Sequence, residues 1–327
     1  MASGEDDLIA RYFKPLATDP GTFGLTDDAA VLASSGEDIV VTVDAVVEGV
    51  HFLPDDPPET LARKALRVNL SDLAAKGAEP AGFVLTLALR EVQENWLAPF
   101  AKALGEDATH FGCPLLGGDT VSTPGPLSIS ITAFGRVPKG RMVRRFGAKP
   151  GDLVMVTGTI GDAALGLDIL RGGAVAKAMA NDATGMAALI DRYRVPQPRT
   201  ALALAVREHA MAAMDVSDGL AGDLTKLCRV SEVSADVRLA DVPLSAQARD
   251  LAARGLVDIG HLVSGGDDYE LLCAVPSAAA ERFARAAKAS GTSATVIGTF
   301  GAGTDAPRFL DAAGKPANLK QLSYSHF

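Results

Sequence analysis

Short runs of branched apolar residues alternate with longer amphipathic stretches along the first part of the chain. The runs at 38–44 and 82–90 are rich in Val, Ile and Leu, and 127–137 alternates apolar and polar positions. These patterns predict three β-strands. Between them, 59–76 and 95–111 repeat apolar residues at the spacing of a helix face, so we expect two α-helices there.

The same alternation begins again after a basic stretch, 137–152, whose Gly and Pro residues predict a linker. Beyond it we expect strands at 152–158, 235–244, 269–275 and 294–300, a short one ending within 214–219, and helices near 161–171, 184–193, 200–211, 219–230, 245–255 and 277–290. A chain of 327 residues also exceeds the usual size of a single core. The sequence thus predicts a mixed α/β protein of two consecutive α/β domains, 1–137 and 138–327.

Composition narrows the class of partner. The net charge of −9 and the 5% of aromatic residues argue against a nucleic acid, which is bound through Lys, Arg and stacked rings. No apolar run approaches the roughly 20 residues of a membrane span, and the acidic start MASGEDD is unlike a signal peptide. Three widely spaced Cys suit a reducing compartment. We therefore expect a cytoplasmic protein without membrane or nucleic-acid partners.

Aspartates recur where strands or helices are expected to end. They are Asp27 and Asp28 in FGLTDDAAVL, Asp44 closing IVVTVD, Asp119 after the strand-like PLLGG, and Asp215 and Asp218 in MDVSDG. The strand ends of α/β proteins are where ligands bind, although each aspartate alone could instead cap a turn or a helix. Their number favours a site of hard oxygen ligands, which predicts Mg²⁺.

Asp72 lies on the apolar face of the helix expected at 59–76. It follows Leu61 and Val68 at helical spacing, and the helix should end near Gly77. An anion in the last turn of a helix opposes the macrodipole by about 0.3–1 kcal/mol, and a bound cation would reverse that sign. The alternative is a structural ion pair between Asp72 and Lys76, four residues on.

Glycine-rich segments accompany these acids: LLGGDT, TGTIGDAALGL and SGGDDYELL would each let the backbone approach a ligand. The sequence contains no P-loop, no HExxH and no GxSxG pattern. Acidic clusters bind anionic phosphates only through bridging metal ions. The residues alone therefore predict a Mg²⁺-dependent phosphate enzyme without a P-loop, and they do not name its substrate.

An ordered set of segments now points to a family. TDDAAVL, VTVDAVVEGVHF, ALRVNLSDLAAKGAEP, GGDT, GRMVRRFGAKPGD, VTGTIGDAALGL, MDVSDGL and SGGDDYELL together closely resemble the thiamine-monophosphate kinases. That family is part of the superfamily of aminoimidazole ribonucleotide synthetase and selenophosphate synthetase. The resemblance spans nearly the whole chain. It implies direct transfer of the ATP γ-phosphate to thiamine monophosphate, with several Mg²⁺ ions, in a homodimer built through the N-terminal strands.

The resemblance also implies roles for individual residues. The expected metal-site residues are Asp28, Thr42, Val43 (through its backbone), Asp44, Asp72, Asp119, Asp215 and Asp218. Gly118, Asp119, Arg145 and Ser217 match positions that contact ATP, and His51, Asp267 and Tyr324 match positions that hold thiamine monophosphate. No covalent nucleophile is expected, because the phosphate oxygen of the substrate can attack in line.

One departure and two alternatives remain at this point. The chain has Gly24, Leu25 and Thr26 where the family usually has Gly-Ile-Gly, so we interpret Asp27 as a supporting acid rather than a metal ligand. The alternatives are an ATP-dependent ligase of the aminoimidazole ribonucleotide synthetase type and a nucleotide-binding regulator without turnover. Selenophosphate synthetase is disfavoured, because no Cys precedes residue 113.

Overall fold

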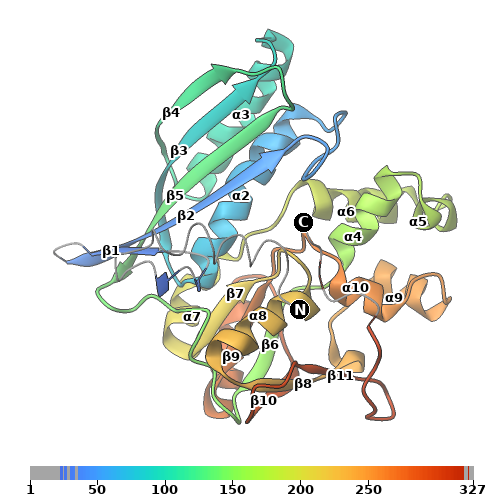
Figure 1. Ribbon diagram of the computed structural model, residues 1–327. Coiled ribbons are helices and arrows are strands. Elements are labelled where there is room, and N and C mark those ends of the chain that lie inside the picture. The colour runs from blue at the N-terminus through green and yellow to red at the C-terminus, as the bar shows by residue number, and fades with distance from the viewer. Residues whose placement is uncertain (1–22, 25, 28–29, 34–35, 320–322, 324–327) are drawn as a thin grey trace.

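Two β-sheets, each packed against helices, follow one another along the chain (Figure 1). The computed structural model describes residues 23–24, 26–27, 30–33, 36–319 and 323. None of the helices within that part of the chain is both long and apolar enough to cross a lipid bilayer.

The first sheet has the strand order β1-β2-β5-β3-β4 and is antiparallel except for the pair β3 and β4. Its strands are β1 (Ala30–Ala33), β2 (Glu37–Val47), β3 (Glu79–Leu89), β4 (Leu115–Ser122) and β5 (Ser128–Pro138). Helices α2 (Pro58–Ala75) and α3 (Glu94–His110) cover one face, where Val40, Ile131 and Phe100 share a buried core (Figure 1). On β2, Val43 points the other way and is 61% exposed.

The second sheet has the order β11-β8-β10-β6-β9-β7 and is antiparallel except for β8 and β11. Its strands are β6 (Leu153–Thr157), β7 (Ala212–Asp215), β8 (Ser234–Arg238), β9 (Leu271–Val275), β10 (Ala294–Gly301) and β11 (Arg308–Leu310). Strands β7 and β9 are buried at every residue, because helices cover both faces of the sheet.

The helices of this second part form three groups. Helix α8 (Leu220–Ser231) packs on one face of the sheet, and η4 (Thr200–Leu202), α7 (Ala203–His209), η6 (Ser277–Ala279) and α11 (Ala280–Ala289) pack on the other. Beside the sheet lie α4 (Asp162–Leu170), α5 (Ala174–Ala178), α6 (Ala183–Arg194), α9 (Ala246–Ala253) and α10 (Ile259–Ser264), with a small core of their own (Figure 1). A short turn of helix, η5 (Leu239–Asp241), follows β8.

Helix α2 joins the two sheets, because its residues enter two different cores. Leu66 and Leu70 pack with the first sheet, whereas Ala74 and Ala75 pack with α7, β7 and β9 of the second. Polar bonds add to this contact: Lys76 Nζ donates to the carbonyl oxygen of Ala213 (3.0 Å). Burial on both sides explains why this helix carries so few exposed positions after its first turn.

The mixed α/β class and most predicted elements are confirmed, but three expectations about strands were wrong. Strand β2 continues past Asp44 to Val47, because its pairing with β5 continues to Ser128. Asp119 lies within β4 rather than after a strand, because β4 pairs with β3 through its two glycines. The strand expected at 235–244 ends at Arg238, where η5 begins.

Candidate active site between the two sheets

Two acidic side chains of the first sheet and its helix meet at the last turn of α2. Thr42 and Asp44 are two residues apart on β2, so both side chains point to the face of the sheet that packs against α2. Thr42 Oγ1 donates a hydrogen bond to Asp72 Oδ2 (2.5 Å). Asp72 is 8% exposed. The helix ends after Ala75, as its spacing predicts, so the Asp72 carboxylate lies where the helix dipole is unfavourable to it.

The second sheet brings Asp215 and Asp218 to the same place. Asp215 is the last residue of β7, and Asp218 lies in the turn that leads to α8. Burial, with the charges of Asp215 and Asp44, raises the pKa of Asp72 well above its ordinary value. Burial and Asp218 raise the pKa of Asp44 to about 6. Four predicted metal-site carboxylates are therefore close enough to influence one another's ionisation. They form the acidic cluster of this site: Asp44, Asp72, Asp215 and Asp218.

Burial also raises the pKa of Asp215 to about 7, and the carboxylates of Asp223 and Asp44 add to this increase. Asp223, on α8, is a site residue that sequence reasoning missed. Its carboxylate accepts the backbone N–H of Asp218 (3.0 Å) and pairs with Lys226 Nζ (3.1 Å). Burial raises the pKa of Asp223 to about 6; the charge of Lys226 opposes this increase, and the charge of Asp218 adds to it. Its spacing of three residues from Lys226 on a helix was the available signal.

Lys226 and Arg145 place positive charge beside these acids. Lys226 Nζ forms ion pairs with both Asp218 and Asp223. Burial alone would lower the pKa of Lys226, but the two carboxylates raise it above its ordinary value, and the nearby charge of Arg145 opposes them. Arg145, predicted to contact ATP, is thus close enough for its charge to reach this end of the acidic cluster.

Asp27 occupies a different position from the cluster. Its Oδ1 pairs with Lys76 Nζ (2.7 Å), with both side chains fully buried. Its Oδ2 accepts the backbone N–H of Arg145 (2.7 Å). Asp27 therefore ties the end of α2 to the segment between the sheets. The backbone N–H of Lys76 donates to the Asp72 carbonyl oxygen (3.0 Å), and the charge of Lys76 opposes the raised pKa of the Asp72 carboxyl. The predicted site residues Asp28 and Tyr324 lie outside the described residues.

Gly118 and Asp119 are not brought to the cluster within one chain. Both lie on β4, an edge strand exposed along its whole length. Asp44 on β2 pairs with Ile131 on β5. Leu85 on β3 pairs with Ile131 on one side and with Gly118 on β4 on the other. Three strand spacings of about 4.8 Å place Asp44 and Gly118 roughly 14 Å apart across the sheet. A Cβ at Gly118 would lie 2.0 Å from the Leu85 carbonyl oxygen, so strand packing alone requires this glycine.

The remaining predicted substrate positions, His51 and Asp267, are joined through one lysine. Lys64 Nζ donates to the His51 carbonyl oxygen (2.9 Å) and pairs with Asp267 Oδ2 (3.1 Å). The backbone N–H of Asp267 donates to the carbonyl oxygen of Ser217 (2.8 Å), a predicted ATP contact. Gly266 makes that approach possible, because a Cβ there would lie 2.6 Å from the same oxygen. Sequence reasoning missed Lys64, whose one signal is a charged residue on a buried helix face.

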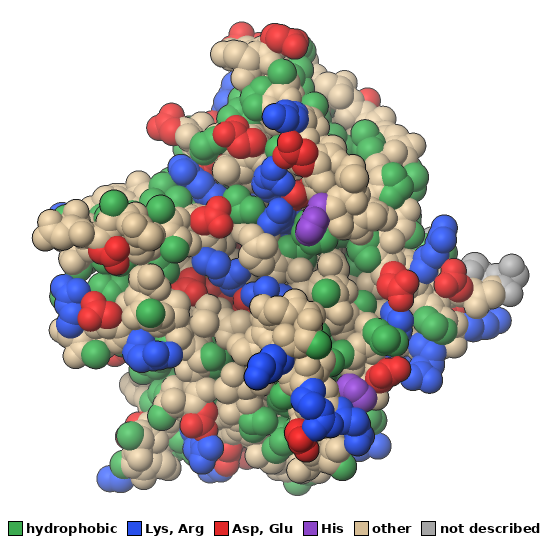
Figure 2. Space-filling view, turned by 180° about the vertical axis from the view of Figure 1, so that it is seen from behind, with side chains coloured by type: hydrophobic (Ala, Val, Ile, Leu, Met, Phe, Trp, Pro, Cys, Tyr) green, Lys and Arg blue, Asp and Glu red, His purple; other side chains and the backbone are tan. Residues whose placement is uncertain are grey.

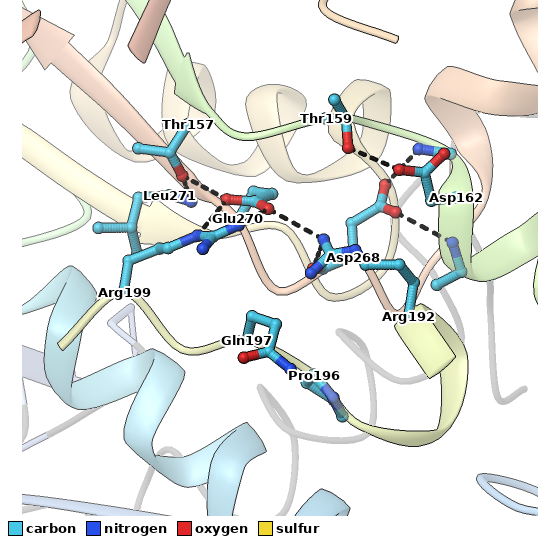
Figure 3. A network of polar contacts seen from close by, with 12 residues as sticks. Thr157, Thr159, Asp162, Arg192, Pro196, Gln197, Arg199, Asp268, Glu270 and Leu271 are labelled. Atoms are coloured by element: carbon cyan, nitrogen blue, oxygen red, sulfur yellow. Dashed lines mark hydrogen bonds and ion pairs between the residues drawn. The ribbon is translucent and has the colours of Figure 1, made fainter. Parts of the chain in front are cut away.

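A buried polar network holds the segment that follows Asp267 (Figure 3). Glu270, at 0% exposure, pairs with Arg192 (2.9 Å) and Arg199 and accepts the hydroxyl of Thr157 (2.7 Å). Asp268 accepts the backbone N–H of Gly161 (2.7 Å), and burial raises its pKa well above the ordinary value. These contacts keep the SGGDDYELL segment in one conformation beside the MDVSDG turn.

The outer surface behind this region carries mixed charge. Figure 2 shows basic and acidic side chains interspersed where the two sheets meet. Elsewhere the structure contains buried or partly buried ion pairs, including Arg194 with Asp56 (2.6 Å) and Arg67 with Asp107 (2.5 Å).

Comparison with known proteins identifies the family. The family model of the AIR synthase related protein N-terminal domain matches residues 26–137, and that of the C-terminal domain matches 149–308. A thiamine-monophosphate kinase of Caulobacter vibrioides is 44% identical, over 98% of this chain and 90% of its own length. The chain belongs to the thiamine-monophosphate kinase family. The resemblance inferred from the sequence motifs is thus confirmed.

Solved structures agree with this membership in the thiamine-monophosphate kinases. The structure of AaThiL complexed with AMPPCP and TMP has a TM-score of 0.81 and 28% identity, covering 94% of this chain and 97% of that one. The thiamine-monophosphate kinase of Stenotrophomonas maltophilia has a TM-score of 0.78 and 36% identity, covering 97% of this chain and 99% of its own. The arrangement of the two sheets is therefore shared with a relative whose structure holds an ATP analogue.

The residues present fit, in their chemistry, the magnesium site that the family resemblance implies. All the cluster's side chains offer hard oxygen donors, and Asn69 Oδ1, one turn before Asp72 on α2, is buried without a hydrogen-bond partner among the described residues. Within that same part of the chain, no three His, Cys, Asp or Glu side chains converge closely enough to hold a metal ion unaided. Water and phosphate oxygens normally complete the coordination of Mg²⁺.

Proposed function

We propose that this chain transfers the γ-phosphate of ATP to thiamine monophosphate, giving thiamine diphosphate and ADP in a Mg²⁺-dependent reaction. The observation that carries the proposal is the group of buried and half-buried aspartates that α2 and the two sheets bring together, Asp44, Asp72, Asp215 and Asp218. Burial and neighbouring carboxylates raise the pKa of Asp44 to about 6 and that of Asp215 to about 7. Acids that repel one another at a cost to stability are typical of functional sites, and a bound cation would remove the repulsion. The kinship to AaThiL, solved with AMPPCP and TMP, supports the choice of substrates.

The proposed roles follow the family resemblance residue by residue. Mg²⁺ would be held by Asp28, Thr42, the Val43 backbone, Asp44, Asp72, Asp119, Asp215 and Asp218. Bound Mg²⁺ supplies charge neutralisation for the triphosphate. Gly118, Asp119, Arg145 and Ser217 would contact ATP, and His51, Asp267 and Tyr324 would hold thiamine monophosphate. The planar guanidinium of Arg145 suits a phosphate, which it can bind through two N–H groups.

Transfer is proposed to be direct, because no side chain need become phosphorylated when the substrate phosphate attacks in line. One displacement inverts the configuration at phosphorus and two retain it. ATP made chiral at a thiophosphate γ-phosphorus distinguishes these outcomes. We expect inversion, and net retention or an isolable phosphoenzyme would contradict direct transfer.

The active unit is proposed to be a homodimer that assembles through the first sheet. Strand β4 is an exposed edge, and Leu116 on it is 60% exposed, as Val43 is 61% exposed on β2. Long exposed edges with apolar side chains are normally covered by another chain. A second copy would also bring a Gly118 and an Asp119 from outside the chain that carries Asp44.

We propose a cytoplasmic location, in line with three free, buried cysteines.

The deciding experiment is an assay of the purified wild-type protein with Mg²⁺-ATP and a panel of acceptors. The panel contains thiamine monophosphate, free thiamine and aminoimidazole ribonucleotide precursors. We expect labelled γ-phosphate in thiamine diphosphate alone. Ring closure of an aminoimidazole precursor would favour the ligase alternative, and tight ATP binding without turnover of any acceptor would favour a regulator.

A further inference from the structure

A buried lysine stands at the point where both domains meet the predicted substrate positions. The side chain of Lys64, on α2, is only 2% exposed. Burying an ammonium group is unfavourable unless it is fully paired. Lys64 is paired in three directions: with the His51 carbonyl oxygen (2.9 Å), with Asp267 Oδ2 (3.1 Å), and with the Tyr193 ring, whose centroid is 3.8 Å from Nζ.

These partners come from opposite sides of the interdomain junction. His51 precedes α2 in the first part of the chain, whereas Tyr193 lies in the last turn of α6 and Asp267 lies 203 positions beyond Lys64. Tyr193 strengthens the arrangement, since its hydroxyl donates to the same His51 carbonyl oxygen (3.1 Å). The His51 ring is held as well, because its Nδ1 accepts the backbone N–H of Val47 (3.0 Å). Lys64 thus connects the two residues that the family resemblance assigns to the substrate.

Asp267 depends on such support. Its backbone has a φ of +70°, a left-handed conformation that non-glycine residues seldom adopt. The backbone N–H is tied to Ser217, and Lys64 directs one carboxylate oxygen. The side chain is still 25% exposed, and among the described residues no hydrogen bond engages Oδ1. A carboxylate held through one oxygen can accept a hydrogen bond from an amino group of a substrate through the other.

Resting on the function proposed above, we infer that Lys64 is a positioning residue for the acceptor substrate. An ammonium has three N–H donors, and the carbonyl, the carboxylate and the ring occupy three directions around Lys64. It therefore acts through Asp267 and His51 rather than by touching the substrate. Its loss should weaken binding of thiamine monophosphate and leave the ATP side of the site unchanged.

A double-mutant cycle of Lys64→Met and Asp267→Asn tests this inference. Each single variant should raise the KM for thiamine monophosphate by about 10- to 100-fold, the usual effect of losing a hydrogen bond to a charged group, with little change in kcat or in the KM for ATP. The effect of the double variant should be clearly smaller than the product of the two single effects, because residues that act as one unit are not additive. Binding of thiamine monophosphate by calorimetry gives the same comparison without turnover.

The control is Lys102→Met, which removes a lysine whose side chain is 78% exposed on α3 and should change neither KM. Effects of Lys64→Met and Asp267→Asn that multiply, or an equal rise in both KM values, would overturn the inference. If Lys64→Met does not fold, Lys64→Arg tests the same contact by moving the positive charge. An unchanged KM for thiamine monophosphate in Lys64→Arg would also overturn the inference. Inactive wild-type protein would contradict the proposed function, whereas active wild type with an additive cycle contradicts only the role of Lys64.

Discussion

Asp72 and Asp119 belong to the same predicted metal site, yet they lie in opposite environments. Asp72 is 8% exposed, receives a hydrogen bond from Thr42 and is repelled by Asp215 and Asp44. Asp119 lies on β4, where every residue is exposed. Asp72 and its neighbouring acids are brought together within one chain, at a cost to the stability of the fold. Asp119 instead lies on an exposed edge strand, apart from them. The metal site proposed above therefore requires both the contact between the two sheets and, for Asp119, a second copy of the chain.

The largest expected effect is that of Asp72→Asn. We expect activity to fall by about a hundredfold or more, as when a key electrostatic group of an active site is removed. Without metal, the variant should be at least as stable as the wild type, because asparagine keeps the volume and removes repulsion by Asp215 and Asp44. The measurements are turnover with thiamine monophosphate and thermal melting in chelator.

Asp250→Asn is the matched control, since Asp250 is 62% exposed on α9 and, within the described part of the chain, its carboxylate pairs with Arg254 alone (2.9 Å). It should change neither activity nor, beyond about 0.5 kcal/mol, stability. If Asp72→Asn melts lower in chelator and still turns over normally, the carboxylate is structural and the contrast with Asp119 disappears.

Asp119→Asn should lower activity by about 10- to 100-fold while leaving stability in chelator unchanged, because no buried charge is altered on the exposed strand. Mixing this variant with Asp72→Asn sharpens the comparison. If each site takes Asp119 from one copy and Asp72 from another, reassorted dimers contain one intact site, and about a quarter of wild-type activity returns. A mixture as inactive as its components would show that both acids serve the same chain's site.

The smallest expected effect is the pH dependence of the metal-free protein. The pKa values of Asp44 and Asp223 are raised to about 6 and that of Asp215 to about 7, so the folded state binds more protons than the unfolded state at these groups. Their contribution to stability is therefore present at low pH and is lost as pH rises through these values.

We expect the melting temperature in chelator to fall between about pH 4 and pH 7, from the ordinary pKa of Asp to the raised values, and to fall less steeply in Asp215→Asn, which lacks one of these groups. The Asp119→Asn variant should keep the wild-type slope. Identical slopes in all three proteins would mean that the buried acids do not carry the pH dependence. Added Mg²⁺ should reduce the fall, since it binds the ionised carboxylates.

Local pattern was sufficient for most of the fold. The apolar spacing of α2 predicted both its length and its end, and alternation predicted β5. Local pattern was insufficient where strand pairing sets the end of a strand. Asp44 and Asp119 were expected at strand ends, but pairing with β5 extends β2 past Asp44, and pairing with β3 extends β4 past Asp119. The chemistry of the site was expected from its aspartates, whereas Lys64, Asp223 and Glu270 were missed, because the local sequence does not reveal whether a charged side chain is buried.

By itself, the sequence determined most of the elements that form, the family to which the chain belongs and the oxygen donors that are available to a cation. Only the tertiary structure decided which of those donors share one space. Asp72 and Asp215 raise each other's cost of ionisation because α2 packs against both sheets, and Asp27 binds Lys76 because the end of that helix is buried beside it. A pKa depends on burial and on neighbouring charges, and for these residues both are supplied by segments distant in the chain.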